Sequence, residues 1–197
     1  MTTWAIIPVK PLHKSKSRLS GVLSKEERFE LMREMFLHVL ATLRAVSTID
    51  EIMVVSKEPS IASLAPDATI YRRENPSNLN AAVRGAAAHA WERGADTIVI
   101  LPADLAILES EDVSDLIATR GSVVICPDNK FDGTNGLLLR QLPHFTFRYG
   151  EESFQKHLGE AARHEAIAQV MYADSIEFDL DTPADLQQYR RATLQPT

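Results

Sequence analysis

The stretch "WAIIPVKPLHKSKSRL", residues 4–19, opens with an apolar run and continues as a loop with four cations. The run from Trp4 to Ile7 predicts a short buried strand over residues 3–9. The cations that follow it are Lys10, Lys14, Lys16 and Arg18. Because no glycine lies between Pro8 and Arg18, the loop differs from the glycine-rich phosphate loops. In a chain of net charge −6 we interpret it as a site for a small anion, with an ordinary solvated loop as the alternative.

Strand-like and helix-like segments alternate from this first strand to the end of the sequence. Further apolar, strand-length runs lie at 52–56, 97–101, 122–126 and 136–139. Helix starts are indicated by Ser24 in a capping box with Glu27, by Ser77, by Ser110, and by Thr182 before a proline. This alternation predicts an α/β fold with a mostly parallel sheet and helices on both faces. The length and the absence of a linker or repeat predict a single domain over residues 1–197.

Composition narrows the class of protein. A hydrophobic content of 45% and a charged content of 24% are typical of globular proteins. The apolar runs are too short to span a membrane, and the first residues lack a secretory pattern, so we expect a cytoplasmic protein without a membrane partner. The acidic balance argues against a nucleic-acid partner.

Two acidic loops follow predicted strands, where ligands of such sheets bind. "VILPADLAIL", residues 99–108, places Asp104 just after a buried strand, in a position to hold a divalent cation or to cap a turn. "FDLDTPADL", residues 178–186, carries Asp179 and Asp181, which we expect to point to opposite sides, one of them toward the site. Cations at one strand end and carboxylates at two others indicate a site for a metal–nucleoside triphosphate complex.

Other reactive side chains show no pattern of their own. The six histidines lack metal-ligand spacing, and we interpret them as surface or packing residues. The single cysteine, Cys126, lies in an apolar strand and excludes a disulfide framework. Covalent catalysis therefore has no candidate nucleophile.

Five stretches, taken in order, resemble the guanylyltransferases that make the activated phospho-acid of deazaflavin coenzyme (factor 420) biosynthesis. They are "IPVKPLHKSKSRL", "LPADLAIL", "PDNKFDGTNGLLL", "FRYGEESFQKH" and "FDLDTPADL". The first and last are shared with other nucleotidyltransferases, whereas "DGTN" combined with "YGEESFQKH" is more specific. The resemblance implies a three-layer GT-A-like nucleotidyltransferase fold with a mostly parallel mixed sheet. It also implies GMP transfer from GTP to phosphoenolpyruvate, 2-phospho-L-lactate or 3-phospho-D-glycerate, with release of pyrophosphate.

The same resemblance assigns roles to residues. It implies Mg²⁺ on Asp104 and on the Asp179/Asp181 segment, and the phospho-acid on Thr134, Gly150 and Ser153. We assign the nucleotide to Pro8, Lys10, Lys16, Arg18, Asn80 and Asp104, with Lys16, Arg18 and Asp104 as the catalytic residues. Ser153 begins a predicted helix over 153–163, where the helix dipole favours an anion. Asn78 stands where the family commonly has glycine.

Three questions stay open at this level. A cytidylyl- or uridylyltransferase acting on a sugar or alcohol phosphate would keep the same charged loops, and so would a non-catalytic nucleotide-binding module. The sequence does not select one phospho-acid acceptor, because the candidates differ by only a few atoms. A homodimer and a direct handover of the product to the next enzyme of the pathway are both compatible with the sequence.

Overall fold

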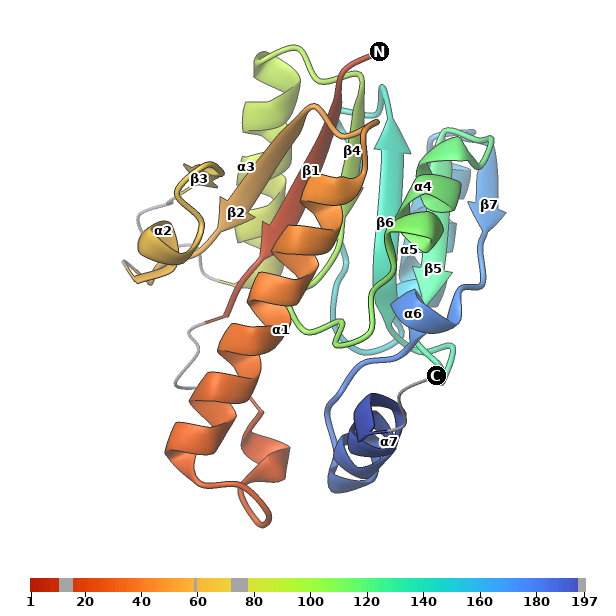
Figure 1. Ribbon diagram of the computed structural model, residues 1–197. Coiled ribbons are helices and arrows are strands. Elements are labelled where there is room, and N and C mark those ends of the chain that lie inside the picture. Colours follow the sequence, from red (N-terminus) through yellow and green to blue (C-terminus); the bar gives the residue numbers. More distant parts are fainter. Residues whose placement is uncertain (11–15, 59, 72–77, 195–197) are drawn as a thin grey trace.

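The computed structural model describes residues 1–10, 16–58, 60–71 and 78–194, and its described strands form one seven-stranded sheet (Figure 1). The strand order across the sheet is β3-β2-β1-β4-β6-β5-β7. The strands are β1 Thr3–Pro8, β2 Glu51–Val55, β3 Thr69–Tyr71, β4 Thr97–Ile100, β5 Val123–Pro127, β6 Thr134–Arg140 and β7 Ala168–Val170. Strand β6 runs antiparallel to its neighbours β4 and β5, and the other described pairs are parallel. The predicted mostly parallel sheet is confirmed.

Helices cover both faces of this sheet. They are α1 Lys25–Ala45, α2 Ser60–Leu64, α3 Leu79–Glu92, α4 Ser110–Ala118, α5 Ser153–Arg163, α6 Asp174–Glu177 and α7 Pro183–Leu194, with a 3-10 turn at Ser17–Leu19. Helices α1 and α4 lie in front of the sheet and α3 and α5 behind it (Figure 1). Side chains of β1 alternate between the layers, with Ala5 and Ile7 in the α1/α4 core and Trp4 and Ile6 in the α3/α5 core. The result is a three-layer α/β fold.

Helix starts follow local sequence signals, with two corrections. The Ser24 capping box is present, since Ser24 Oγ accepts from Glu27 N at 3.1 Å and Glu27 Oε2 accepts from Ser24 N at 2.7 Å. The N-cap of α3 is Asn78, whose Oδ1 accepts from Ala81 N at 3.0 Å, while the expected cap Ser77 lies outside the described residues. Ser110 is the first residue of α4 and not its cap, because the extended residue before it is Glu109.

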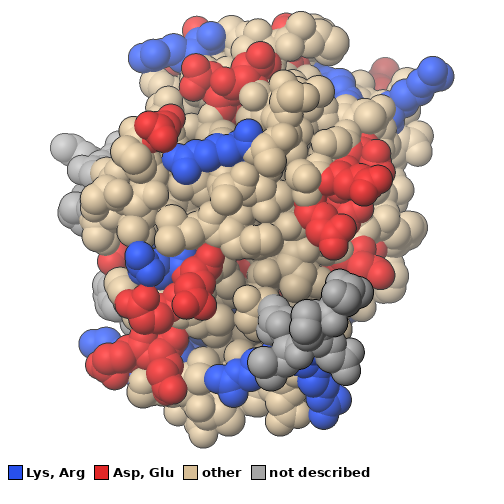
Figure 2. Space-filling model, in the orientation of Figure 1, with Lys and Arg blue, Asp and Glu red and all other residues tan. Residues whose placement is uncertain are grey.

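The sheet brings several chain segments to one edge. Because β1, β4 and β5 run in the same direction, their carboxyl ends lie at the same edge. The antiparallel β6 begins at that edge, where Thr134 pairs with Pro127. On the face formed by α1 and α4, basic side chains are interspersed with groups of acidic ones (Figure 2). None of the helices in the described part of the chain combines the length and apolar character needed to cross a bilayer.

Candidate active site

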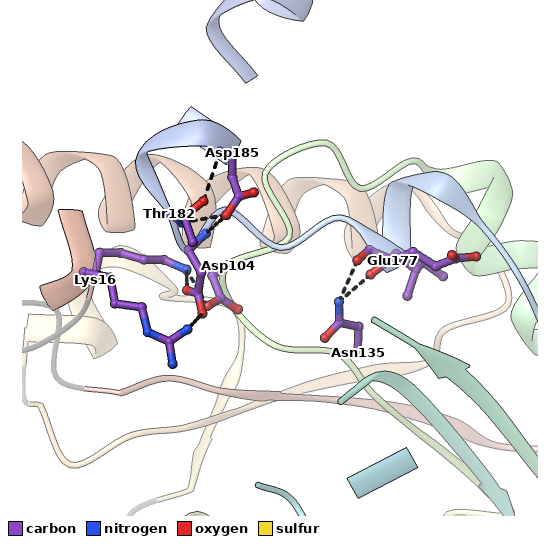
Figure 3. A network of polar contacts seen from close by, with 9 residues as sticks. Lys16, Asp104, Asn135, Glu177, Thr182 and Asp185 are labelled. Atoms are coloured by element: carbon purple, nitrogen blue, oxygen red, sulfur yellow. Dashed lines mark hydrogen bonds and ion pairs between the residues drawn. The ribbon is translucent and has the colours of Figure 1, made fainter. Parts of the chain in front are cut away.

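A buried lysine joins two of the predicted acidic residues. The Lys16 side chain is only 2% exposed, and its Nζ donates to Asp104 Oδ2 at 2.7 Å and to Asp181 Oδ1 at 2.9 Å (Figure 3). Burial lowers the pKa of Lys16, but the charges of Asp104 and Asp181 raise it above its usual value overall, so the ammonium stays charged. The backbone of Lys16 is left-handed, with φ at 56°. The loop after β1 is thereby drawn against the loop after β4.

The segment before α7 supplies two carboxylates from the same side, so the expectation that they diverge is wrong. Residues two apart in an extended segment share a face, and here Phe178 and Leu180 are buried in the core. Burial, followed by the charges of Asp181 and Asp104, raises the pKa of Asp179 to about 6. We call Lys16, Asp104, Asp179 and Asp181 the carboxylate–lysine cluster.

Asp181 stays ionised although it is partly buried. Burial raises its pKa, but Lys16, which also donates a hydrogen bond, brings the pKa below its usual value, with Arg18 and Lys10 adding to the effect. Its backbone is fixed by Asp185, whose Oδ2 accepts from Asp181 N at 3.0 Å and from Thr182 N at 2.6 Å. The first turn of α7 therefore holds the metal-ligand candidate in place.

Asn135, the second residue of β6, holds the backbone that leads to Asp179. It is buried, and its Nδ2 donates to the carbonyl oxygens of Ile176 at 3.0 Å and Glu177 at 3.2 Å (Figure 3). These carbonyls close α6 just before Asp179. Sequence reasoning missed this support, although "GTN" belongs to a quoted motif.

Two other predicted nucleotide-binding residues, Arg18 and Lys10, lie near Asp181 of the cluster. The Arg18 side chain is 71% exposed, and its guanidinium lies 3.4 Å from Asp181 Oδ2. Lys10 is exposed and close enough for its charge to act on Asp181, and Pro8 ends β1. Lys14 lies outside the described residues.

Asn80 contacts the backbone beside Gly150. Its Oδ1 accepts from Tyr149 N at 2.7 Å and its Nδ2 donates to Tyr149 O at 3.0 Å. Both ends of the amide are therefore engaged with one residue, so the side chain acts here as a clamp between α3 and the 148–150 segment. The predicted contact with the nucleotide is not tested by this geometry.

The three predicted phospho-acid residues lie around the N-terminus of α5. Gly150 has φ at 121°, which favours glycine, and its carbonyl accepts from Ser153 N at 3.1 Å. Ser153 is 1% exposed and faces the sheet. Thr134 reaches the same helix one turn later, where its Oγ1 lies 3.0 Å from His157 Nδ1. The structure thus brings Thr134, Gly150 and Ser153 to one helix end.

An acidic turn anchors this helix end. Asp128 Oδ1 accepts from Lys130 N at 3.1 Å and Asp132 N at 2.9 Å, closing the turn between β5 and β6. Asp132 in turn accepts from Glu152 N at 3.2 Å through its side chain and from Phe154 N at 3.0 Å through its carbonyl. Sequence reasoning did not identify either aspartate.

The carboxylates of Asp104 and Asp181 are oxygen donors of the kind that a hard divalent cation prefers. Within the described residues no three His, Cys, Asp or Glu side chains form a ready metal site. Oxygens of Asp104 and Asp181 nevertheless converge on one point, which the Lys16 ammonium holds. Because Mg²⁺ is commonly bound by one or two carboxylates together with substrate phosphates, the residues present fit it.

Comparisons with known proteins agree with this geometry. Residues 3–189 match the sequence family described as guanylyl transferase, CofC like. A phosphoenolpyruvate guanylyltransferase of Rubrobacter xylanophilus is 37% identical over 94% of this chain and 92% of its own length. A 2-phospho-L-lactate guanylyltransferase of Methanothermobacter thermautotrophicus is 33% identical over 94% of this chain and 83% of its own.

A solved structure shares the fold. A Desulfovibrio desulfuricans G20 protein, provisionally described as a nucleotide-diphospho-sugar transferase, superposes with a TM-score of 0.82 at 18% identity. The superposition covers 100% of this chain and 90% of that one. The predicted nucleotidyltransferase fold is confirmed.

Proposed function

The chain belongs to the CofC-like guanylyltransferase family, and we propose that it transfers GMP from GTP to a small phospho-acid with release of pyrophosphate. The acceptors we consider are phosphoenolpyruvate, 2-phospho-L-lactate and 3-phospho-D-glycerate, and the product would serve deazaflavin coenzyme (factor 420) biosynthesis. The observation that carries the proposal is the meeting of two sites at one sheet edge. Thr134 and Asn135 are consecutive, and one contacts the acceptor helix while the other supports the carboxylate segment.

The reaction needs no general base. An oxygen of the acceptor phosphate attacks the α-phosphorus of GTP, the bond to the bridging α–β oxygen breaks, and pyrophosphate leaves with that electron pair. A phosphate monoester has a second pKa near 6, so most acceptor molecules are dianions at pH 7. The nucleophile is therefore ready without a base, and the main obstacle is the mutual repulsion of two polyanions.

The carboxylate–lysine cluster would reduce this repulsion by holding a metal ion. When bound there, Mg²⁺ would supply positive charge against the negative charge that accumulates on pyrophosphate. Asp104 and Asp181 would hold that ion, with Asp179 beside them. Arg18, whose guanidinium is exposed, is the cation best placed to move onto the triphosphate. Lys16 would orient the two carboxylates, since it already contacts both.

The end of α5 would hold the acceptor. Backbone N–H groups around Gly150, the Ser153 hydroxyl and the Thr134 hydroxyl are donors of the kind that binds small anions. Asn80 and His157 hold the backbone just before Gly150, since Asn80 accepts from Tyr149 N and His157 accepts from Arg148 N. Positioning of the two substrates would then supply much of the rate enhancement.

Pyrophosphate release tests the proposal. Purified protein with Mg²⁺ is assayed with each of the four nucleoside triphosphates, combined with each acceptor or with none. We expect release with GTP and one phospho-acid only, and we expect Asp104→Asn to abolish it while Asp115→Asn, an exposed position of α4, retains it. Release with CTP or UTP, or no release in any combination, would overturn the proposal.

A further inference from the structure

His157 is a buried histidine whose two ring nitrogens both have partners. It is 0% exposed on the sheet-facing side of α5. Its Nε2 lies 3.0 Å from the backbone N of Arg148, and its Nδ1 lies 3.0 Å from Thr134 Oγ1. The ring therefore joins the segment before Gly150 to the first residue of β6.

The Arg148 contact fixes which nitrogen carries the proton. A backbone N–H can only donate, so Nε2 must be the accepting nitrogen of the ring. In a neutral imidazole the proton is then on Nδ1, which donates to Thr134 Oγ1. The ring stays neutral near pH 7, because burial lowers the pKa of His157 to about 4, and the charge of Arg148 acts in the same direction against that of Glu160.

This tautomer determines what the Thr134 hydroxyl can do. Its oxygen accepts from His157, so its own hydrogen must point elsewhere. Within the part of the chain that the structure describes, that hydrogen has no acceptor. Thr134 is 7% exposed and begins β6 at the substrate edge of the sheet, so its free hydroxyl hydrogen can donate to a bound ligand, in place of water.

The rings around His157 keep it in one orientation. Tyr149 packs edge-on at a centroid distance of 4.9 Å, and Phe145 lies 5.9 Å away on another side. Tyr149 is itself clamped by Asn80 through both backbone groups. A buried ring with both nitrogens paired and aromatic neighbours around it has little freedom to flip, so Nε2 stays the nitrogen that accepts from Arg148 N.

We propose that His157 is a positioning residue that makes Thr134 a hydrogen-bond donor to an anionic oxygen of the acceptor. It does so by donating to Thr134 Oγ1 while accepting from Arg148 N, which also holds the segment that leads to Gly150. This inference rests on the proposed function, since the anion is the phosphate or carboxylate of the phospho-acid. His157 acts through Thr134 and does not contact the reacting atoms.

Two substitutions test the two hydrogen bonds of the His157 ring separately. In His157→Gln the longer amide reaches the Nε2 position and can accept from Arg148 N, but the donor to Thr134 is lost. In His157→Asn the short amide places an N–H near the Nδ1 position, so the donor to Thr134 is restored and the acceptor is lost. His144→Gln, at an exposed site, is the matched control.

Steady-state kinetics of pyrophosphate release give the first readout. We expect His157→Gln to raise the acceptor KM roughly three- to tenfold, on the scale of one hydrogen bond, with the GTP KM unchanged. We expect His157→Asn to rescue most of that loss. In a Thr134→Val background, His157→Gln should cause no further change, because the hydroxyl it acts through is gone. Equal effects of the two His157 variants, or an effect that persists in Thr134→Val, would overturn the inference.

Nitrogen-15 NMR of the wild-type histidine gives a second readout that no variant can confound by unfolding. We expect the His157 shifts between pH 6 and 8 to show a protonated Nδ1 and a bare Nε2. A proton on Nε2, or an imidazolium in this range, would overturn the inference. If the wild type released no pyrophosphate with any acceptor, the proposed function would fail. The NMR measurement would still test the tautomer of His157 independently of that result.

Discussion

Replacing Asp179 by asparagine should stabilise the metal-free protein at neutral pH. Burial and the nearby charges of Asp181 and Asp104 raise the pKa of Asp179 to about 6 from an ordinary value of 3.8. The ionised form of this carboxylate therefore destabilises the folded state. Asparagine has nearly the same shape and no charge, so it removes that cost while it also removes a candidate metal ligand.

The magnitude follows from the difference between the two pKa values. At full weight that difference corresponds to about 3 kcal/mol, since one pKa unit is about 1.4 kcal/mol. Because Asp179 is only partly buried, solvent screening reduces the expected gain to about 1–2 kcal/mol. Well below the ordinary pKa of 3.8 the carboxyl is protonated in both states and the cost is absent. Between about pH 4 and 6 the unfolded chain ionises first, so stability falls as pH rises, and above pH 6 the full cost is present.

Urea unfolding in EDTA at pH 4, 5, 6 and 7.5 measures this profile. For a urea m value of about 2 kcal/mol per molar, Asp179→Asn should shift the midpoint upward by roughly 0.5–1 M at pH 7.5 and by only about 0.1–0.2 M at pH 4. Asp115→Asn should follow the wild type at every pH. The reasoning would be refuted if Asp179→Asn were no more stable than the wild type at pH 7.5, or if its advantage did not change with pH.

Three further outcomes follow from the same site. Lys16→Met leaves Asp104 and Asp181 without their shared cation, so its free energy of unfolding at pH 7.5 should fall by about 1–3 kcal/mol. Millimolar Mg²⁺ should raise the Tm of this variant more than that of the wild type, and an equal rise in thermal unfolding would contradict this. Asn80→Ala breaks two hydrogen bonds to Tyr149, so it should raise the acceptor KM about tenfold or more and the GTP KM less. A larger rise in the GTP KM than in the acceptor KM would favour direct contact of Asn80 with the nucleotide. Asp104→Asn should lower kcat at least about a hundredfold, and EDTA should stop pyrophosphate release by the wild type until Mg²⁺ is restored; full activity in EDTA would exclude the metal.

The parts of the site that sequence reasoning found are those that follow from strand direction and local capping. Asp104 comes directly after β4 and Lys16 shortly after β1, and parallel strands carry such residues to the same edge. Thr182 and Asp185 read as a helix start, which places Asp181 one residue before it. Each of these placements depends either on residues close together in the sequence or on the rule that parallel strands end at the same edge.

The parts that it missed depend on contacts between distant elements. The bond from Lys16 to Asp181 joins residues 165 positions apart, so the loop charges alone suggested a phosphate partner and not a carboxylate one. His157 lacks a metal-ligand spacing, and its burial bears out a packing role, but its polar bridge became visible only with Thr134 beside it. One signal was available, since His157 lies one helical turn after Ser153 and therefore on the same face of α5.

The antiparallel strand β6 explains how the two halves of the site keep a fixed separation. Successive residues of a strand point to opposite faces, so Thr134 and Asn135 reach different layers of the molecule. Thr134 contacts His157 of α5, while Asn135 holds the carbonyls of Ile176 and Glu177 that precede Asp179. One peptide bond therefore separates the contact to α5 from the contact to the segment that carries Asp179 and Asp181. A parallel strand would present its carboxyl end at this edge. Because β6 is reversed, its paired first residues lie there, which would suit the proposed reaction between two anions.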